Sequence, residues 1–170
     1  PQGATDTILE DTAQHTAKTV CAVCHGETGI SPNDIWPNLA GQKYAYLLNE
    51  LRGFHDNTRN DELMSPYAIQ LNDEEMKALA RYYSRQKPEG LRNTSGNSTR
   101  THTKEQSRIV AEEFCTPCHG VDGISTMDDW PNLAGQKRSY LLKQLQDFRD
   151  LRRQGFMVDP AQILTDDEFQ

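Results

Sequence analysis

The chain contains two copies of one sequence segment, and this repeat constrains its fold more than any other feature. The first copy, at residues 21–48, reads CAVCHGETGISPNDIWPNLAGQKYAYLL, and the second, at residues 115–142, reads CTPCHGVDGISTMDDWPNLAGQKRSYLL. They align without a gap, and 19 of the 28 positions are identical. A further stretch, residues 63–76, aligns with residues 156–169 after a deletion of one residue. Tandem copies of one module predict two similar domains.

The segment between the two copies has the composition of a linker. Residues 87–101 are polar, contain one proline and two glycines, and show no apolar period. We therefore expect an N-terminal domain at residues 1–87, a polar linker at residues 88–101 and a C-terminal domain at residues 102–170.

Apolar residues recur with a helical period within each copy and predict an all-α fold with long irregular loops. In the first copy the pattern predicts helices at residues 11–24 and 43–55 and a third helix that starts at Asn72. In the second copy it predicts a helix at residues 103–118 and a counterpart of the second helix. The counterpart of the third helix reaches only its first turn at Gln170, so we expect it to be incomplete.

Each copy begins with the motif C-x-x-C-H. Two thiols three positions apart can add to the two vinyl groups of one haem, while the adjacent histidine ligates the iron. One such pentapeptide is weak evidence, but two in register within a repeat are strong evidence for two haem c groups. The residues predicted to bind them are Cys21, Cys24 and His25 in the first copy and Cys115, Cys118 and His119 in the second.

Two other interpretations of the cysteines fit less well. A thioredoxin-like redox pair requires a βαβ context, which the sequence lacks. A structural zinc site requires four ligands, and each copy offers three nitrogen or sulfur candidates close together. Haem also explains the composition, because 35% hydrophobic residues and a mean hydropathy of -0.79 leave little apolar material for two ordinary cores.

The sixth iron ligand is predicted from the repeat. Met64 and Met157 occupy equivalent positions, some forty residues after each motif and close to a proline, and His/Met ligation is usual for cytochromes c. Met76 aligns with a phenylalanine and is expected to fill the core. Met127 is not repeated either, so the same role is expected of it.

Further repeated residues are candidates for supporting the haems. Pro37 and Pro131 lie 12 residues after the motif histidines, and each offers a backbone carbonyl to the imidazole Nδ1–H or simply shapes the loop. Three other repeated pairs either hydrogen-bond the haem propionates or pack on the haem. They are Trp36 and Trp130, Gln42 and Gln136, and Tyr46 and Tyr140.

These motifs resemble the cytochrome c4 family of dihaem class I cytochromes. The resemblance rests on CHGxxGIS, WPNLAGQKxxYLL, the methionine loop and LNDEEMKALARYYSRQ. It implies two tandem class I cytochrome c domains, each wrapped around one covalent haem and related by pseudo-twofold symmetry. It pairs His25 with Met64 at the first iron and His119 with Met157 at the second.

The implied function is electron transfer toward a terminal oxidase, in the periplasm after removal of a signal peptide, with association with the inner membrane as a variant. The implied partners are a membrane cytochrome oxidase or quinol-oxidising complex, small cytochromes or blue-copper proteins. The alternatives are a cytochrome subunit of a larger redox complex and a dihaem peroxidase, which needs two unlike haem sites. A net charge of -7 without a basic cluster argues against nucleic acid, and no apolar run approaches the roughly 18 residues of a membrane span.

Overall fold

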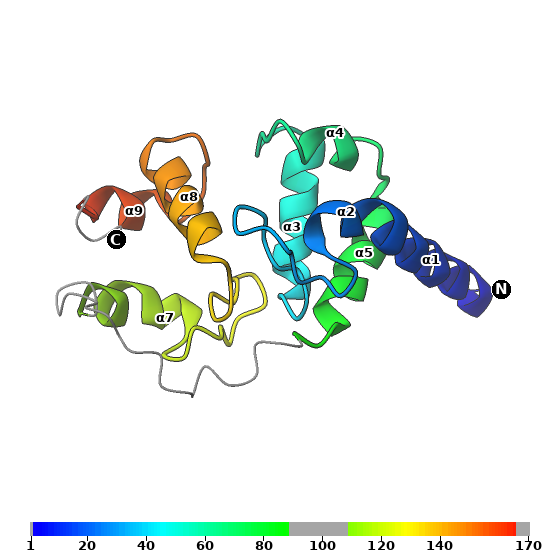
Figure 1. Ribbon diagram of the computed structural model, residues 1–170, viewed down its shortest axis with the longest axis horizontal. Helices are drawn as coiled ribbons and strands as arrows, with labels where there is room; N and C mark the ends of the chain where they lie inside the picture. The colour runs from blue at the N-terminus through cyan, green and yellow to red at the C-terminus, as the bar shows by residue number, and fades with distance from the viewer. Residues whose placement is uncertain (1, 89–108, 166–170) are drawn as a thin grey trace.

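The computed structural model describes residues 2–88, called the first half below, and residues 109–165, the second half. Within these ranges the chain forms helices and loops and no strand, which confirms the predicted all-α fold class. Figure 1 shows the two halves side by side along the longest axis of the molecule. Residues 89–101 of the predicted linker and the predicted helical residues 103–108 and 166–170 lie outside the described part of the chain.

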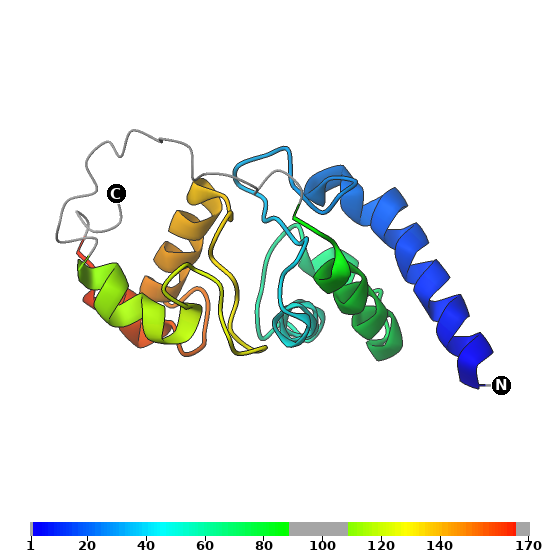
Figure 2. The same ribbon diagram turned by 90° about the horizontal axis from the view of Figure 1, so that it is seen from below.

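The first half opens with one long helical segment. α1 (Gln2–Thr16) continues through a π-helical turn, η1 (Ala17–Cys21), into α2 (Ala22–His25). The predicted start at residue 11 was wrong, because the helix begins at Gln2. Its first turns carry few apolar residues, and Ile8 is 66% exposed, so no apolar period marks them. In Figure 2 the N-terminal turns lie outermost, beside α5.

Two of the remaining helices of the first half, α3 (Tyr44–His55) and α5 (Asp73–Arg85), agree with the prediction, whereas the short α4 (Ser65–Ala68) was not predicted. Asn72 caps α5 in a capping box: its side chain accepts a hydrogen bond from the Glu75 N–H at 3.0 Å, and the Glu75 carboxylate accepts one from the Asn72 N–H at 2.8 Å. The predicted third helix is therefore confirmed, with its start fixed by this box.

The core of the first half lies where α5 packs against α1 and α3. Four of its nine buried residues are alanines, which let the helices approach closely and leave only a small amount of apolar volume. The predicted core role of Met76, which is 3% exposed, is confirmed. The nine residues are Ala13, Ala17, Leu47, Leu48, Met76, Ala78, Leu79, Ala80 and Tyr83.

The described residues of the second half repeat η1, α2, α3 and α4 and contain fewer buried apolar residues. Among residues 109–165 the buried apolar residues are Phe148 and Ala161, and Leu141, Leu142 and Leu145 are only half-buried. The elements are η2 (Ala111–Cys115), α7 (Thr116–His119), α8 (Arg138–Arg149) and α9 (Val158–Ile163).

The Asp147 carboxylate of α8 gives the second half a pH-dependent contribution to stability. Burial by itself raises the pKa of Asp147, but hydrogen bonds from Lys143 and Arg152 outweigh burial and hold the pKa below its ordinary value. A carboxyl group whose pKa is lower in the folded state than in the unfolded state stabilises the folded state. This contribution is complete above the unfolded pKa of about 4 and is lost as the pH falls through the folded pKa.

We therefore expect Asp147→Asn to lower the free energy of unfolding by about 1 kcal/mol at pH 7, since both cationic partners are half-exposed and solvent screens the pairs. At pH 3 the deficit should be smaller. Urea unfolding at both pH values measures it, with Asp129→Asn, at an exposed aspartate of the same half, as the control. An equal deficit at pH 3 and pH 7 would refute the electrostatic explanation.

The two halves meet in a set of reciprocal hydrogen bonds. The N–H of Asn38 donates to Gln136 Oε1 at 2.9 Å, and the N–H of Asn132 donates to Gln42 Oε1 at 2.8 Å. Each glutamine amide in turn donates to the carbonyl of the same asparagine, at 3.0 Å in both cases. Asn132 and Gln42 are the equivalents of Asn38 and Gln136 in the repeat, and the two pairs make the same contacts in opposite directions across the boundary. The two halves are therefore related by a pseudo-twofold axis.

A second cluster of polar side chains, called the arginine ring below, also joins the halves. Glu50 forms ion pairs with both Arg59 and Arg153. Gln144 accepts a hydrogen bond from each of these arginines at 2.7 Å. Each guanidinium also stacks on a phenylalanine of its own half, with Arg59 lying 4.3 Å from the ring centre of Phe54.

Candidate functional site

Each C-x-x-C-H motif lies at the end of a helix that the following glycine terminates. The cysteines of both motifs are half-buried and not joined in disulfides. Gly26 has a φ of +78°, and a Cβ at this position would lie 2.1 Å from the Ile30 carbonyl oxygen. Gly120 is in the same conformation, at +79°. The glycine of CHG is therefore needed to reverse the chain directly after the histidine.

His25 has one ring nitrogen fixed and the other free. Its Nδ1 lies 3.0 Å from the Pro37 carbonyl oxygen, and because a carbonyl only accepts, Nδ1 carries the proton. The residue is 5% exposed, and Nε2 is buried without a hydrogen-bond partner. Burial lowers the pKa of His25, partly offset by the bond to Pro37, so the ring is neutral. A buried, unprotonated Nε2 is what an axial iron ligand requires, so this site fits a haem.

His119 repeats the arrangement in the second half. It is 4% exposed, and its Nδ1 lies 2.8 Å from the Pro131 carbonyl oxygen. Trp130 packs edge-on against the imidazole, with 5.9 Å between the ring centroids. The predicted role of the Pro37 and Pro131 carbonyls as imidazole acceptors is thus confirmed in both halves.

The loop that carries each proline is tied back to its own motif by a serine and an asparagine. The Ser31 hydroxyl donates to the Cys24 carbonyl at 2.9 Å, and the Ser31 N–H donates to Asn38 Oδ1 at 2.9 Å. In the second half Ser125 makes the same two contacts, at 2.8 and 3.1 Å. These serines and asparagines lie in the repeated GIS and PNL segments, but their role in anchoring the loop was not predicted from the sequence.

The two repeated methionines lie at equivalent places. Met64 directly precedes α4 and Met157 directly precedes α9, and both side chains are half-buried. The Met64 N–H donates to the Asp61 carboxylate at 3.0 Å, which anchors the first of these loops. In Figure 1, α9 lies above α7 and beside α8. Axial ligation by the methionines remains a prediction.

The other repeated polar residues join the two halves. Gln42 and Gln136 hydrogen-bond across the boundary, as described above. Tyr46 accepts a bond from an arginine of the second half at 3.3 Å, and Tyr140 accepts one from the first half at 3.4 Å. From the sequence these side chains were expected to hydrogen-bond the haem propionates or to pack on the haem. Their contacts between the halves were not predicted.

The histidines outside the two motifs and Met127 are not repeated between the copies. His15 is exposed and His55 is half-buried, while His102 lies outside the described residues. Met127 is 43% exposed, so the expectation that it fills a gap in the core was wrong.

Burial and neighbouring groups define the surroundings of the motif cysteines. Among the described residues no three His, Cys, Asp or Glu side chains gather to hold a metal ion. Burial raises the pKa of Cys21, an effect that a hydrogen bond involving Tyr83 opposes, and burial also raises the pKa of Cys115. Burial therefore disfavours the thiolate form of these two cysteines.

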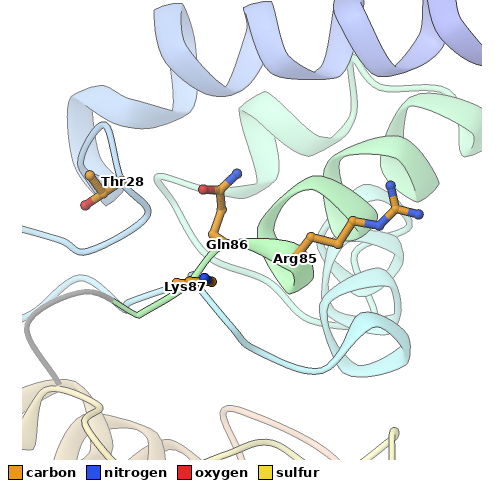
Figure 3. Close-up of a pocket in the computed structure, with 4 residues that line it drawn as sticks. All are labelled: Thr28, Arg85, Gln86 and Lys87. Atoms are coloured by element: carbon orange, nitrogen blue, oxygen red, sulfur yellow. The ribbon is translucent and has the colours of Figure 1, made fainter. Parts of the chain in front are cut away.

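A surface pocket in the first half has neither motif histidine in its lining. Thr28, Arg85, Gln86 and Lys87 line it, and in Figure 3 the Arg85 side chain points away from Thr28. Arg85 pairs instead with Glu10 at 3.3 Å. The pocket is an open polar depression without a converging set of groups. Within the described residues, no helix has the length and apolar character needed to cross a membrane.

Known proteins similar to this chain are dihaem cytochromes and their relatives. Residues 9–82 match the family described as cytochrome c oxidase, cbb3-type, subunit III. A thiosulfate dehydrogenase electron acceptor of Thiomonas intermedia is 33% identical, over 85% of this chain and 68% of that protein. Cytochrome c4 of Thiocapsa roseopersicina is also 33% identical, over 89% of this chain and 83% of its own length.

A solved structure shows the same architecture. Reduced cytochrome c4 from Pseudomonas stutzeri superposes with a TM-score of 0.76 at 26% identity, covering 94% of this chain and 92% of that one. The two cysteine pairs, at residues 21/24 and 115/118, fit two covalent haem c groups in tandem cytochrome c domains. The chain therefore belongs to the cytochrome c4 family of dihaem electron-transfer proteins.

Proposed function

We propose that this protein relays electrons in the periplasm through two His/Met-ligated haems and delivers them toward a terminal oxidase. The observation that carries the proposal is the buried, unprotonated Nε2 of His25, held ready by the Pro37 carbonyl. Each haem, when bound, supplies an iron that takes up and releases one electron. The partners would be a membrane oxidase or quinol-oxidising complex, a small cytochrome or a blue-copper protein.

In this proposal the residues divide into three roles. The cysteines of the two motifs form the thioethers, the motif histidines supply one axial ligand, and the methionines supply the other. The domains would span residues 1–87 and 102–170, with residues 88–101 as the linker. The ligand pairs are His25 with Met64 and His119 with Met157, and the thioether residues are Cys21, Cys24, Cys115 and Cys118.

Replacing one methionine tests the ligation. We expect Met64→His to remove half of the far-red Met-to-iron absorption and to lower one of the two reduction potentials by on the order of 0.1 V, because axial ligands tune haem potentials over roughly 0.8 V. Met157→His should do the same at the other site. Met127→His, at an exposed and unrepeated methionine, is the control and should change neither value. Unchanged far-red absorption in Met64→His would exclude this methionine as a ligand.

A second candidate function is to accept electrons from a thiosulfate-oxidising enzyme. The relative from Thiomonas intermedia, whose name describes that role, favours it. The two functions differ in the electron donor, so the test is reduction of the oxidised protein by a thiosulfate dehydrogenase in the presence of thiosulfate. Rapid reduction would support this candidate, and reduction only by a quinol-oxidising complex would support the first.

A further inference from the structure

One peptide group in each half contacts both the motif histidine of its own half and a glutamine of the other half. The carbonyl of the Pro37–Asn38 peptide accepts the His25 Nδ1–H at 3.0 Å. The N–H of the same peptide donates to Gln136 Oε1 at 2.9 Å. His25 and Gln136 are thus linked through a single polarisable amide.

The second half contains the mirror arrangement. The carbonyl of the Pro131–Asn132 peptide accepts the His119 Nδ1–H at 2.8 Å, and its N–H donates to Gln42 Oε1 at 2.8 Å. Both glutamines are held rigidly, because each oxygen also accepts the N–H of the following lysine, at 2.9 Å from Lys43 and 3.0 Å in the second half. Gln42 is 7% exposed, so water does not compete for its bonds.

Hydrogen bonds in such a chain strengthen one another. An acceptor on the N–H of an amide makes its carbonyl oxygen more negative and a better acceptor, by about 10–30% per bond. A stronger bond at Nδ1 raises the basicity of the imidazole at Nε2. A more basic axial ligand favours the ferric state and lowers the reduction potential of the iron that it holds.

We propose that Gln136 and Gln42 tune the two iron sites crosswise, Gln136 acting on His25 and Gln42 acting on His119. They are positioning residues that act through the intervening peptide. The inference rests on the proposed axial role of these histidines. In this arrangement the contact between the halves helps to set the reduction potential of each iron, because separating the halves would weaken the Nδ1–H hydrogen bonds of both motif histidines.

The test is whether replacing each glutamine affects the histidine of the other half and leaves the histidine of its own half unchanged. In the reduced holoprotein with ¹⁵N-labelled histidine, we expect Gln136→Leu to move the His25 Nδ1–H resonance upfield and to leave that of His119 in place. The ferric-to-ferrous equilibrium of the first iron should shift about two- to tenfold toward ferrous, where tenfold equals 59 mV for one electron. Gln42→Leu should do the same to His119 and the second iron.

Two further variants separate tuning from a general loosening of the contact. Gln144→Leu removes a glutamine of the same interface that bonds neither peptide, and should move neither resonance. Gln136→Glu keeps an acceptor oxygen and should return the His25 resonance at least to its wild-type position. Shifts confined to the variant's own half, or equal shifts at both histidines, would overturn the inference. Absence of iron-bound histidine signals in the wild type would instead overturn the proposed function.

Discussion

The double variant Cys115→Ala/Cys118→Ala is expected to lose one of the two haems and, with it, the fold of the second half. Among residues 109–165, Phe148 and Ala161 are the buried apolar residues, which is too little apolar surface to offset the entropy of ordering the chain. The haem must therefore supply most of the core. We expect loss of the whole stability of this half, about 5 kcal/mol or more.

The haem-to-protein ratio and limited proteolysis measure this result. The pyridine haemochrome assay should give one haem per chain, and a protease should digest the second half while sparing the first. The matched control is Cys21→Ala/Cys24→Ala. It should also leave one haem but retain more helix, because nine buried residues gather in the core of the first half. Dispersed amide signals from residues 109–165 in the first variant would contradict the prediction.

The sequence predicted those features that depend on local patterns. The apolar period of α3 and the capping box of Asn72 and Glu75 fix their helices with residues that lie close together in the chain. The bond from each motif histidine to a proline carbonyl followed from a fixed spacing of 12 residues within one loop. Apolar periodicity did not predict the start of α1, because residues 2–7 are polar apart from one glycine and one alanine.

The contact between halves could not be predicted, because a repeat identifies equivalent residues but not their partners. Asn38 and Gln136 occur in both copies, and each could bond within its own copy or with the other. The reciprocal arrangement appears only once the two copies face each other across the pseudo-twofold axis. Arg59 and Arg153 also occupy equivalent positions in the two copies, and the repeat likewise does not indicate that both contact Glu50.

The arginine ring carries a net charge of one positive unit, since Glu50 is its single acid beside two arginines. Side-chain exposure is 20% for Glu50, 15% for Arg59 and 10% for Arg153, so water screens these charges poorly. The pair of Lys77 with Asp73, at 33% and 48% exposure, is a contrasting surface pair, and such pairs are worth about 0–1 kcal/mol. The ring is therefore the place where losing one charge has a large effect.

We expect Glu50→Gln to destabilise the contact between the halves by about 3–5 kcal/mol, the range found when one partner of a buried ion pair is removed. The variant keeps the shape of the side chain but leaves the half-buried Arg59 and the buried Arg153 without a counter-charge. Denaturant unfolding of the holoprotein, together with its radius of gyration in solution, should show the halves separating at lower denaturant than in the wild type.

The pseudo-twofold axis provides a matched control for this prediction, because Gln144 occupies the position equivalent to Glu50. Gln144→Glu adds a second acid to the same two arginines and brings the ring to zero net charge, so we expect it to preserve or raise the stability of the contact. Glu50→Gln removes one negative charge from the ring and Gln144→Glu adds one, while the size of the side chain stays the same in both variants. If both variants weakened the contact equally, packing around the ring, and not its charge balance, would hold the halves together.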